Sequence, residues 1–200
     1  MTSIITGDII NSRESEPKKW LNALKNTLTT FGDSPKTWEI FRGDSFQLEI
    51  KPEHALKAAI LIKAIIKIYK NIDVRIAIGL GKKTYDSDKI TESNGSAFVN
   101  SGECFENMKN NTLAVKSDFE AFNTTINIML ELAQLTMNNW SATSSEIIKT
   151  SLENPQLNQG QIAKLLGKSQ SNISEGLKRG GFDEITKLLD YYKTQVKTIC

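Results

Sequence analysis

The stretch SIITGDIINSR, residues 3–13, decides how the rest of the chain is organised. Its apolar first half predicts a buried strand, and Gly7 and Asp8 follow where the chain must turn. A second stretch, FRGDSFQLEI at residues 41–50, places Gly43 and Asp44 between two strand-like halves. Taken singly, each Gly-Asp pair is explained by turn chemistry, because both residue types favour turns.

Taken together, the two Gly-Asp pairs support a second interpretation. Two carboxylates brought to the ends of neighbouring strands are suited to sharing a divalent cation. A glycine beside each of them leaves space for a phosphate to approach the backbone. Asp8 and Asp44 are therefore either turn residues or metal ligands, and the local sequence leaves both interpretations open.

The composition is that of a soluble globular protein. Among 200 residues, 39% are hydrophobic and 24% are charged, which excludes disordered, fibrous and membrane proteins. Cys104 and Cys200 lie far apart, without a CxxC motif or a histidine at ligand spacing, so neither a disulfide framework nor a zinc site is supported. The chain shows no signal peptide and no apolar run of spanning length, so we expect a cytoplasmic protein without a membrane segment.

The succession of patterns predicts an α+β fold, because paired strands interrupt the alternation of strands and helices. In the helix over residues 55–69, we expect Lys57, Lys63 and Lys67 to extend past their apolar neighbours into water. Asp118 is placed to cap a long helix. After the first strand we expect a helix from Pro17, strands at 38–42 and 45–50, a helix from Pro52, a strand at 74–80, a helix at 97–108, a strand at 113–115 and a helix to residue 138.

From residue 140 onward the pattern changes to short helices without strands, which predicts a second, all-α domain. The most specific motif of the chain lies there, LNQGQIAKLLGKSQSNISEGLKRGG at residues 157–181. Ala163, Gly167, Ile173 and Leu177 have the spacing of a helix-turn-helix, with Ser169 as the cap of its second helix. The expected helices cover residues 141–153, 159–166, 170–178 and 183–193.

The exposed side of that motif is suited to double-stranded DNA, because amides and hydroxyls read base edges and cations contact phosphates. Glu175 opposes this assignment, since a carboxylate near a phosphate is repulsive. The alternative is a plain packing unit or a protein-binding module. The expected base-reading residues are Gln170, Ser171, Asn172 and Ser174, and the expected phosphate contacts are Lys164, Lys168, Lys178 and Arg179.

An ordered series of motifs along the chain resembles the class III nucleotidyl cyclases and, more loosely, the diguanylate cyclases. This resemblance covers about the first 120 residues. Together with the helix-turn-helix, the stretches ITGDIINSR, GDSFQ and RIAIGLG resemble the SatD family of small bacterial proteins over nearly the whole chain. The cyclase-like motifs are Asp8-Ile9 with Ser12, Gly43-Asp44, VRIAIGLG at residues 74–81, and Gly95 with Val99-Asn100.

The resemblance implies a palm-like domain of the ferredoxin-like, nucleotidyl cyclase type at residues 1–120, a connecting helix at 121–139 and a helix-turn-helix domain at 140–200. It implies that Asp8 and Asp44 hold Mg²⁺ or Mn²⁺ and act in catalysis if the protein is an enzyme. Asn100 corresponds to the residue that orients the ribose. The residues implied to cradle the nucleotide phosphates are Ile9, Ile10, Asn11, Ser12 and Gly43.

Two departures from the cyclase pattern favour binding over turnover. Ile40 occupies the position of the base-recognising lysine, and the arginine that neutralises transition-state charge has no clear match. Loss of such an arginine removes an interaction needed mainly in the transition state, so nucleotide binding can survive where turnover does not.

Three functions therefore stay open. The first is a DNA-binding, transcriptional regulator that senses metal with a nucleotide or another phosphorylated ligand, with the signal passing through the helix at residues 118–138. The second is a magnesium-dependent nucleotidyl cyclase or nucleotidyltransferase, and the third is a protein-interaction module with a degenerate palm. We expect a homodimer, because two-fold symmetry suits palindromic operators.

Overall fold

A five-stranded mixed sheet forms the centre of the protein, whose computed structural model describes residues 1–199. The strand order is β2-β3-β1-β4-β5, and all neighbours are antiparallel except β4 and β5. This mixed sheet with helices confirms the expected α+β class. The strands are β1 (Thr2–Ile10), β2 (Trp38–Phe41), β3 (Ser45–Ile50), β4 (Asp73–Gly81) and β5 (Leu113–Lys116).

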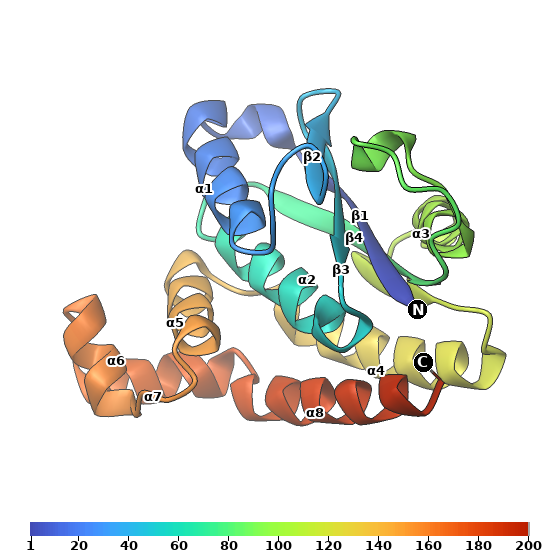
Figure 1. The fold of residues 1–200 in the computed structure, drawn as a ribbon. Helices are drawn as coiled ribbons and strands as arrows, with labels where there is room; N and C mark the ends of the chain where they lie inside the picture. Colours follow the sequence, from blue (N-terminus) through green and yellow to red (C-terminus); the bar gives the residue numbers. More distant parts are fainter. Residues whose placement is uncertain (200) are drawn as a thin grey trace.

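Eight α-helices cover this sheet and extend beyond it in the part of the chain that the structure describes (Figure 1). None of them is both long and apolar enough to span a lipid bilayer. The helices are α1 (Pro17–Thr29), α2 (Pro52–Ile66), α3 (Ser96–Asn107), α4 (Glu120–Met137), α5 (Ala142–Glu153), α6 (Gln159–Leu166), α7 (Gln170–Arg179) and α8 (Phe182–Ile199).

Most predicted boundaries agree with these elements to within two residues, and four details are wrong. The chain does not turn at Gly7 and Asp8, which pair with β3 and β4 inside the sheet, and β1 continues to Ile10. α2 ends at Ile66, three residues before the predicted end at 69. α8 continues six residues beyond the predicted end at 193, because Tyr192 and Val196 lie in the main core. Asp118 does not cap α4, which begins after Phe119. The Asp118 carboxylate instead accepts a hydrogen bond of 3.0 Å from the Asn100 side chain.

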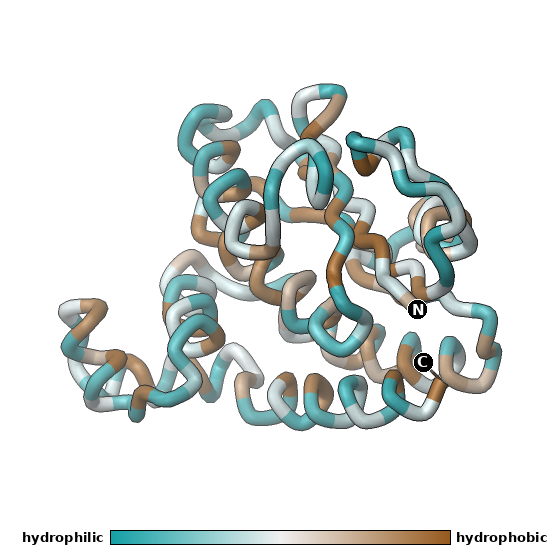
Figure 2. Tube along the Cα trace, viewed as in Figure 1, coloured by the Kyte–Doolittle hydropathy of each residue, from teal (hydrophilic) through white to brown (hydrophobic). Residues whose placement is uncertain are grey.

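Alternation along the strands gives the sheet two differently covered faces. On one face, Ile5, Ile9 and Phe46 join the main core with α1, α2 and α4. The other face carries Ile4 and Ala77, which pack against α3. Figure 2 shows hydrophobic segments where the sheet meets its helices, and an alternation of hydrophobic and hydrophilic residues along α8. α3 thus covers only part of its face, and the end of β1 near Asp8 stays partly exposed.

Gly7 fixes how β1 and β3 pack against each other. It is paired in register with Phe46, whose ring is completely buried. A Cβ atom at Gly7 would lie 2.3 Å from Phe46 Cζ, which is much closer than van der Waals contact allows. The space beside Gly7 is therefore filled by an aromatic ring, and the expectation that it leaves room for a phosphate is wrong.

The C-terminal helices share a core with the sheet. α8 lies along α2 and α4 (Figure 1), and its Tyr192 hydroxyl donates a hydrogen bond of 3.1 Å to the Pro52 carbonyl at the start of α2. Val196 and Leu188 belong to the same buried cluster as Ile5 of β1. The expected domain boundaries near residues 120 and 139 fall at the two ends of α4, and hydrophobic packing continues across both.

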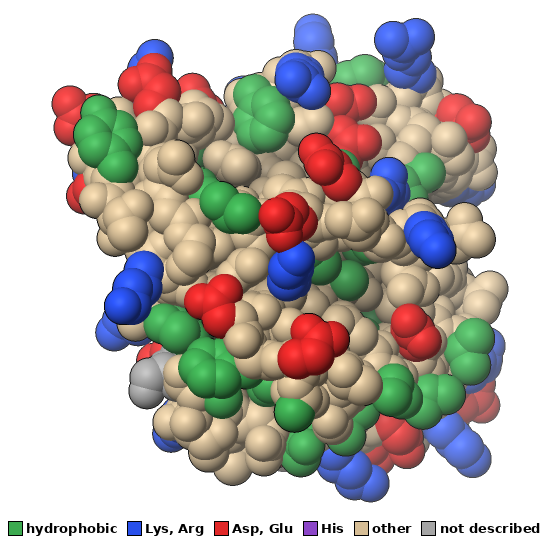
Figure 3. Space-filling view, turned by 90° about the vertical axis from the view of Figure 1, so that its right-hand side faces the viewer, with side chains coloured by type: hydrophobic (Ala, Val, Ile, Leu, Met, Phe, Trp, Pro, Cys, Tyr) green, Lys and Arg blue, Asp and Glu red, His purple; other side chains and the backbone are tan. Residues whose placement is uncertain are grey.

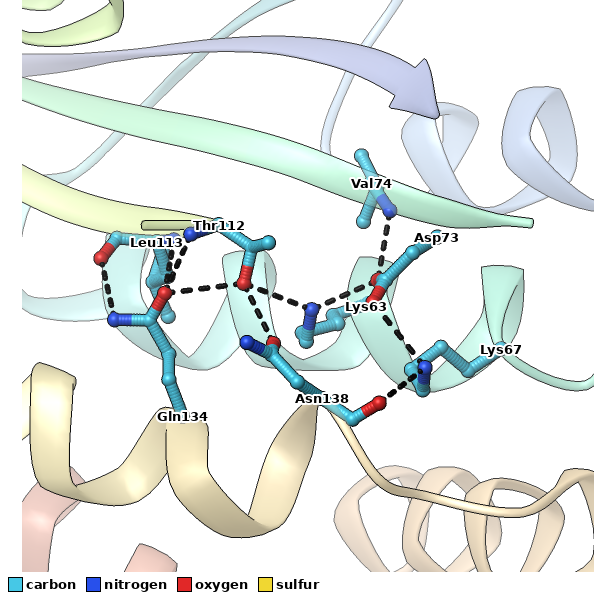
Figure 4. A network of polar contacts seen from close by, with 8 residues as sticks. All are labelled: Lys63, Lys67, Asp73, Val74, Thr112, Leu113, Gln134 and Asn138. Atoms are coloured by element: carbon cyan, nitrogen blue, oxygen red, sulfur yellow. Dashed lines mark hydrogen bonds and ion pairs between the residues drawn. The ribbon is translucent and has the colours of Figure 1, made fainter. Parts of the chain in front are cut away.

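A buried polar network joins α2 to the ends of β4 and α4 (Figure 4). Lys63 is completely buried, and its Nζ donates to Asp73 Oδ1 at 2.7 Å and to Thr112 Oγ1 at 3.1 Å. Lys67 donates to Asp73 Oδ2 at 3.2 Å and to the Asn138 carbonyl at 2.8 Å. The expectation that Lys63 reaches water is wrong, because a carboxylate at the start of β4 compensates its charge inside the core.

We predict that Gly7→Ala lowers the free energy of unfolding by about 1–3 kcal/mol or more, because the added methyl group overlaps the Phe46 ring. The matched control is Gly102→Ala, at a helical position where nothing lies within 4 Å of the added methyl group. It should be neutral or stabilising by up to about 1 kcal/mol. Urea unfolding monitored by circular dichroism measures both, and equal effects would contradict the packing role of Gly7.

Lys63→Met should destabilise the protein by about 1–3 kcal/mol, because it removes the buried cation that compensates the Asp73 carboxylate, together with its hydrogen bonds to Asp73 and Thr112. Burial lowers the pKa of Lys63 to about 8, despite the favourable charge of Asp73. Between that value and about 10.4, its pKa when unfolded, the unfolded chain binds more protons than the folded one. The Lys63 contribution to stability therefore rises with pH across this window.

Unfolding curves from pH 7 to 10 should show this rise in the wild type and in the control Lys57→Met, whose side chain is exposed on the same helix. The rise should be smaller in Lys63→Met. Identical pH profiles for the two variants would refute the assignment.

Candidate functional site

Asp8 and Asp44 lie together where the end of β1 meets the turn between β2 and β3. Asp8 is paired in register with Ser45, the residue that follows Asp44. The Ile9 N–H donates a hydrogen bond of 3.2 Å to the Asp44 carbonyl, which holds the turn against β1. Both carboxylates are partly exposed. Residues that are 36 positions apart in the sequence thus form one acidic site.

Two serine hydroxyls hold the carboxylates in a reciprocal way. Ser45, next to Asp44, donates a hydrogen bond of 2.8 Å to Asp8 Oδ1. Ser12, which follows β1, donates one of 2.7 Å to Asp44 Oδ2. Each aspartate is therefore oriented by a residue from the other's segment, and one oxygen of each carboxylate has no hydrogen bond from these two serines.

The electrostatic environment of Asp8 is unfavourable for a bare carboxylate. Burial raises the pKa of Asp8 above its usual range, and the like charge of Asp44 raises it further. The hydrogen bond from Ser45 and the charge of Arg75 act in the opposite direction. A cation placed between the two aspartates would relieve both effects that raise this pKa.

Arg75 is a member of the site that the sequence did not locate. It is directly opposite Asp8 in the β1–β4 pairing. Its guanidinium lies 4.8 Å from the centre of the Phe105 ring and donates to the Phe105 carbonyl at 3.1 Å, while its buried Nε has no hydrogen-bond partner. The sequence around Arg75 predicts a strand but does not show which residue of β1 lies opposite Arg75. The pairing of Asp8 with Arg75 therefore had to come from the structure.

The donor set fits a magnesium-type ion better than a dedicated metal cage. Within residues 1–199, no group of three or more His, Cys, Asp or Glu side chains is placed to hold a metal. Mg²⁺ is commonly held by one or two carboxylates and completes its octahedron with waters and substrate phosphates. Asp8 and Asp44 would be those two carboxylates, and Ser45 and Ser12 fix their orientation.

Only part of the segment expected to cradle phosphates, residues 9–12 with Gly43, is free to contact a ligand. The Ile9 N–H is already bonded to the Asp44 carbonyl, and the Ile9 side chain is buried in the core. Ile10 is the last residue of β1, and the exposed Asn11 has a left-handed backbone with φ of 56°. Gly43 has φ of 93° and open space around it. Access to the site is therefore widest at Asn11, Ser12 and Gly43.

Asn100 does not lie at the acidic site. It is buried on α3, and its side-chain amide donates to the Leu80 carbonyl at 2.8 Å and to Asp118. Leu80 is five residues along β4 from Arg75, which corresponds to about 16 Å at the usual rise of a strand. Within one chain, Asn100 is too distant to orient a ribose held at Asp8.

α6 and α7 place the other predicted residues on a separate surface. Gly167, with φ of 63°, ends α6, and the Ser169 side chain caps α7. Ala163 and Ile173 are buried between α6, α7 and α5. The four predicted base-reading residues Gln170, Ser171, Asn172 and Ser174 are exposed on α7.

Only some of the predicted phosphate-binding cations are free. Lys164 and Lys178 are exposed and have no ion pair among the described residues. Lys168 forms an ion pair of 3.0 Å with Glu146 of α5. Arg179 forms a close ion pair with Glu175, one turn earlier on α7. Glu175 thus compensates a neighbouring arginine, which reduces the repulsion that its carboxylate would exert on a phosphate.

Cys104 takes no part in either surface. It is buried on α3, and burial raises the pKa of its thiol to about 11. The thiol is therefore protonated near neutral pH and packs as a small apolar side chain. Cys200, the other thiol of the chain, lies outside the described residues.

Comparison with known proteins supports one assignment. No curated protein matches the chain. The model of the SatD family matches residues 2–194 of the 200, from β1 into α8, and includes both the acidic site and the α6–α7 surface. Because the match covers nearly the whole chain, the protein belongs to the SatD family.

Proposed function

We propose that the protein is a cytoplasmic, DNA-binding transcriptional regulator that senses a divalent metal together with a nucleotide or another phosphorylated ligand. The observation that carries the sensor part is that Asp8 and Asp44 lie at one site, each held by a serine from the other's segment, where the like charge of Asp44 contributes to raising the pKa of Asp8. Mg²⁺ or Mn²⁺ bound there would neutralise the pair and attract phosphate oxygens.

The strand topology supports a palm-like domain over residues 1–120. The succession β1-α1-β2-β3-α2-β4 and the antiparallel order β2-β3-β1-β4 are those of a ferredoxin-like unit, to which β5 is added at one edge. Asp8 at the end of β1 and Asp44 in the following hairpin occupy the positions that the nucleotidyl cyclase resemblance assigns to the metal ligands.

Binding is favoured over turnover in this proposal. Asn100 is remote from the acidic site, and the serines and backbone groups around Asp8 and Asp44 are suited to holding a ligand. One observation favours the alternative, a magnesium-dependent nucleotidyl cyclase or nucleotidyltransferase. Arg75 places a fixed positive charge beside Asp8, where it could stabilise charge that develops on a phosphoryl group.

The α6–α7 surface supports the DNA-binding part. Two short helices joined at Gly167 and Ser169, with polar side chains exposed on the second helix, have the form of a helix-turn-helix. Residues at the start of α7 would enter the major groove, and Lys164 and Lys178 would contact phosphates. A homodimer is part of the proposal, because two such helices then match two half-sites.

We predict that a nucleoside triphosphate with Mg²⁺ or Mn²⁺ raises the thermal midpoint of the wild type, since a ligand that binds only the folded state stabilises it. Asp8→Ala and Asp44→Ala should each abolish the shift. Asp33→Ala, which removes an exposed aspartate that follows α1, should keep it. Scanning calorimetry with each of the four triphosphates, with and without metal, measures the effect.

Labelled triphosphates in the same samples separate the sensor from the enzyme. A midpoint shift without a new product supports the sensor, and a product that disappears in Asp8→Ala supports the enzyme. If no triphosphate shifts the midpoint with either metal, the nucleotide part of the proposal is wrong and a protein-interaction module becomes the better interpretation.

DNA binding is tested on a duplex selected from a random pool by the wild-type protein. Asn172→Ala should weaken binding by about 5- to 150-fold, as expected for loss of one base contact. Lys164→Ala should lower the slope of affinity against salt by about one unit, whereas Lys25→Ala on α1 should leave it unchanged. Failure to select any duplex, or equal salt slopes for both lysine variants, would argue against DNA binding.

A further inference from the structure

α4 is apolar on two opposite sides. Its inner side packs against the sheet and α8 through buried residues that include Ile126 and Leu130. Its outer side is exposed, yet beyond the first turn the whole helix carries a single charged residue, Glu131. A surface helix normally presents a polar side to water, so an apolar outer side indicates that something covers it.

Three large apolar side chains form a ridge on that outer side. Ile128, Leu132 and Leu135 are 55%, 64% and 72% exposed. Their spacing of four and three residues places them in one row, about 10 Å long at the rise of an α-helix. Single exposed apolar residues need no explanation, but an ordered row of three does.

A groove runs beside the ridge, between α4 and α8. It has a volume of about 660 Å³. Its apolar lining includes Met129, Ala133, Leu188 and Tyr191. Figure 3 shows hydrophobic side chains over the lower part of the face that it presents. Leu132 of the ridge also lines the groove, so ridge and groove belong to one apolar surface.

The charged side chains at the ridge and at the groove have opposite signs. Glu131 lies beside the ridge, where its carboxylate accepts a hydrogen bond of 3.2 Å from the Asn111 side chain. The groove is lined by Lys178, Lys187 and Glu184, and by Arg179, whose charge is compensated by its ion pair with Glu175, so that the groove keeps a small positive charge. A ridge that is apolar and acidic thus lies next to a groove that is apolar and basic.

We propose that this surface is the interface between two copies of the chain, in which the α4 ridge of each copy fills the α4–α8 groove of the other. A two-fold interface needs one patch that is complementary to itself, and a ridge beside a groove of opposite charge meets that need. Glu131 of each copy then faces Lys187 of the other. The proposal names the surface of the expected homodimer, and it requires neither nucleotide nor DNA.

This arrangement leaves the start of α7 accessible. Lys178 and Arg179 at the groove belong to the last turn of α7. Gln170 and Asn172 lie at the other end of that helix, about 12 Å away at the rise of an α-helix. The partner's ridge therefore competes with DNA phosphates for Lys178. Lys164 lies outside the groove and stays available for a phosphate contact in the dimer.

Sedimentation equilibrium of the full-length protein, from about 1 to 100 μM, tests the proposal. The wild type should be a dimer, and Leu132→Glu should raise the dimer dissociation constant by about 100-fold or more, because it buries a charge in an apolar contact. Leu165→Glu is the matched control, since Leu165 is 59% exposed on α6 and lies outside the surface. It should leave the dimer intact.

A charge exchange tests which residues meet. Glu131→Lys and Lys187→Glu should each weaken the dimer by about 5- to 50-fold, and the double variant should recover most of the loss. The midpoint of thermal unfolding at low protein concentration shows whether each monomer still folds. A wild-type monomer at 100 μM, equal effects of Leu132→Glu and Leu165→Glu, or additive losses in the double variant would each overturn the proposal.

Discussion

The register between β1 and β3 is the constraint on which the rest of the structure depends. Gly7 accepts the Phe46 ring across the strand pair, and only this pairing places Ser45 opposite Asp8. A shift by one residue would turn Asp8 into the apolar core and Ile9 out of it. The packing of one aromatic ring therefore determines both the core beneath the sheet and the acidic site above it.

Turn residues and the periodicity of apolar residues predicted much of the fold. The features that they did not predict depend on contacts between segments that are distant in the sequence. The limits of α6 and the hairpin around Gly43 followed from turn residues and periodicity. The burial of Lys63 did not, because its compensation by Asp73 and Thr112 depends on where β4 and the segment before β5 end. A lysine within an apolar helix can reach water or an internal carboxylate, and its sequence position does not distinguish the two.

The same reasoning applies to the acidic site. Asp8 and Asp44 were found because each follows a glycine next to an apolar stretch, which is a local signal. Arg75 was not located, because its importance comes from antiparallel pairing with Asp8. Asn100 was assigned by its place in a motif series, but α3 directs it toward the opposite end of β4. The order of motifs along the sequence shows the order of the strands and helices. It does not show which of their residues lie close together in space.

Communication between the acidic site and α7 is restricted by the shared core. A ligand changes DNA affinity only if two arrangements of the chain bind that ligand with different affinity. Close-packed helices do not deform gradually. A second arrangement of the helices therefore costs the least free energy where polar contacts hold a short connection between two of them. The connection between α4 and α5 has this character, since the Asn138 carbonyl binds Lys67 and the Trp140 indole N–H binds the Gly180 carbonyl after α7. If the proposed sensor passes a signal from the sheet to α7, the contacts of Asp73, Lys67 and Asn138 would lead it through this connection, at the end of the helix that was expected to carry it.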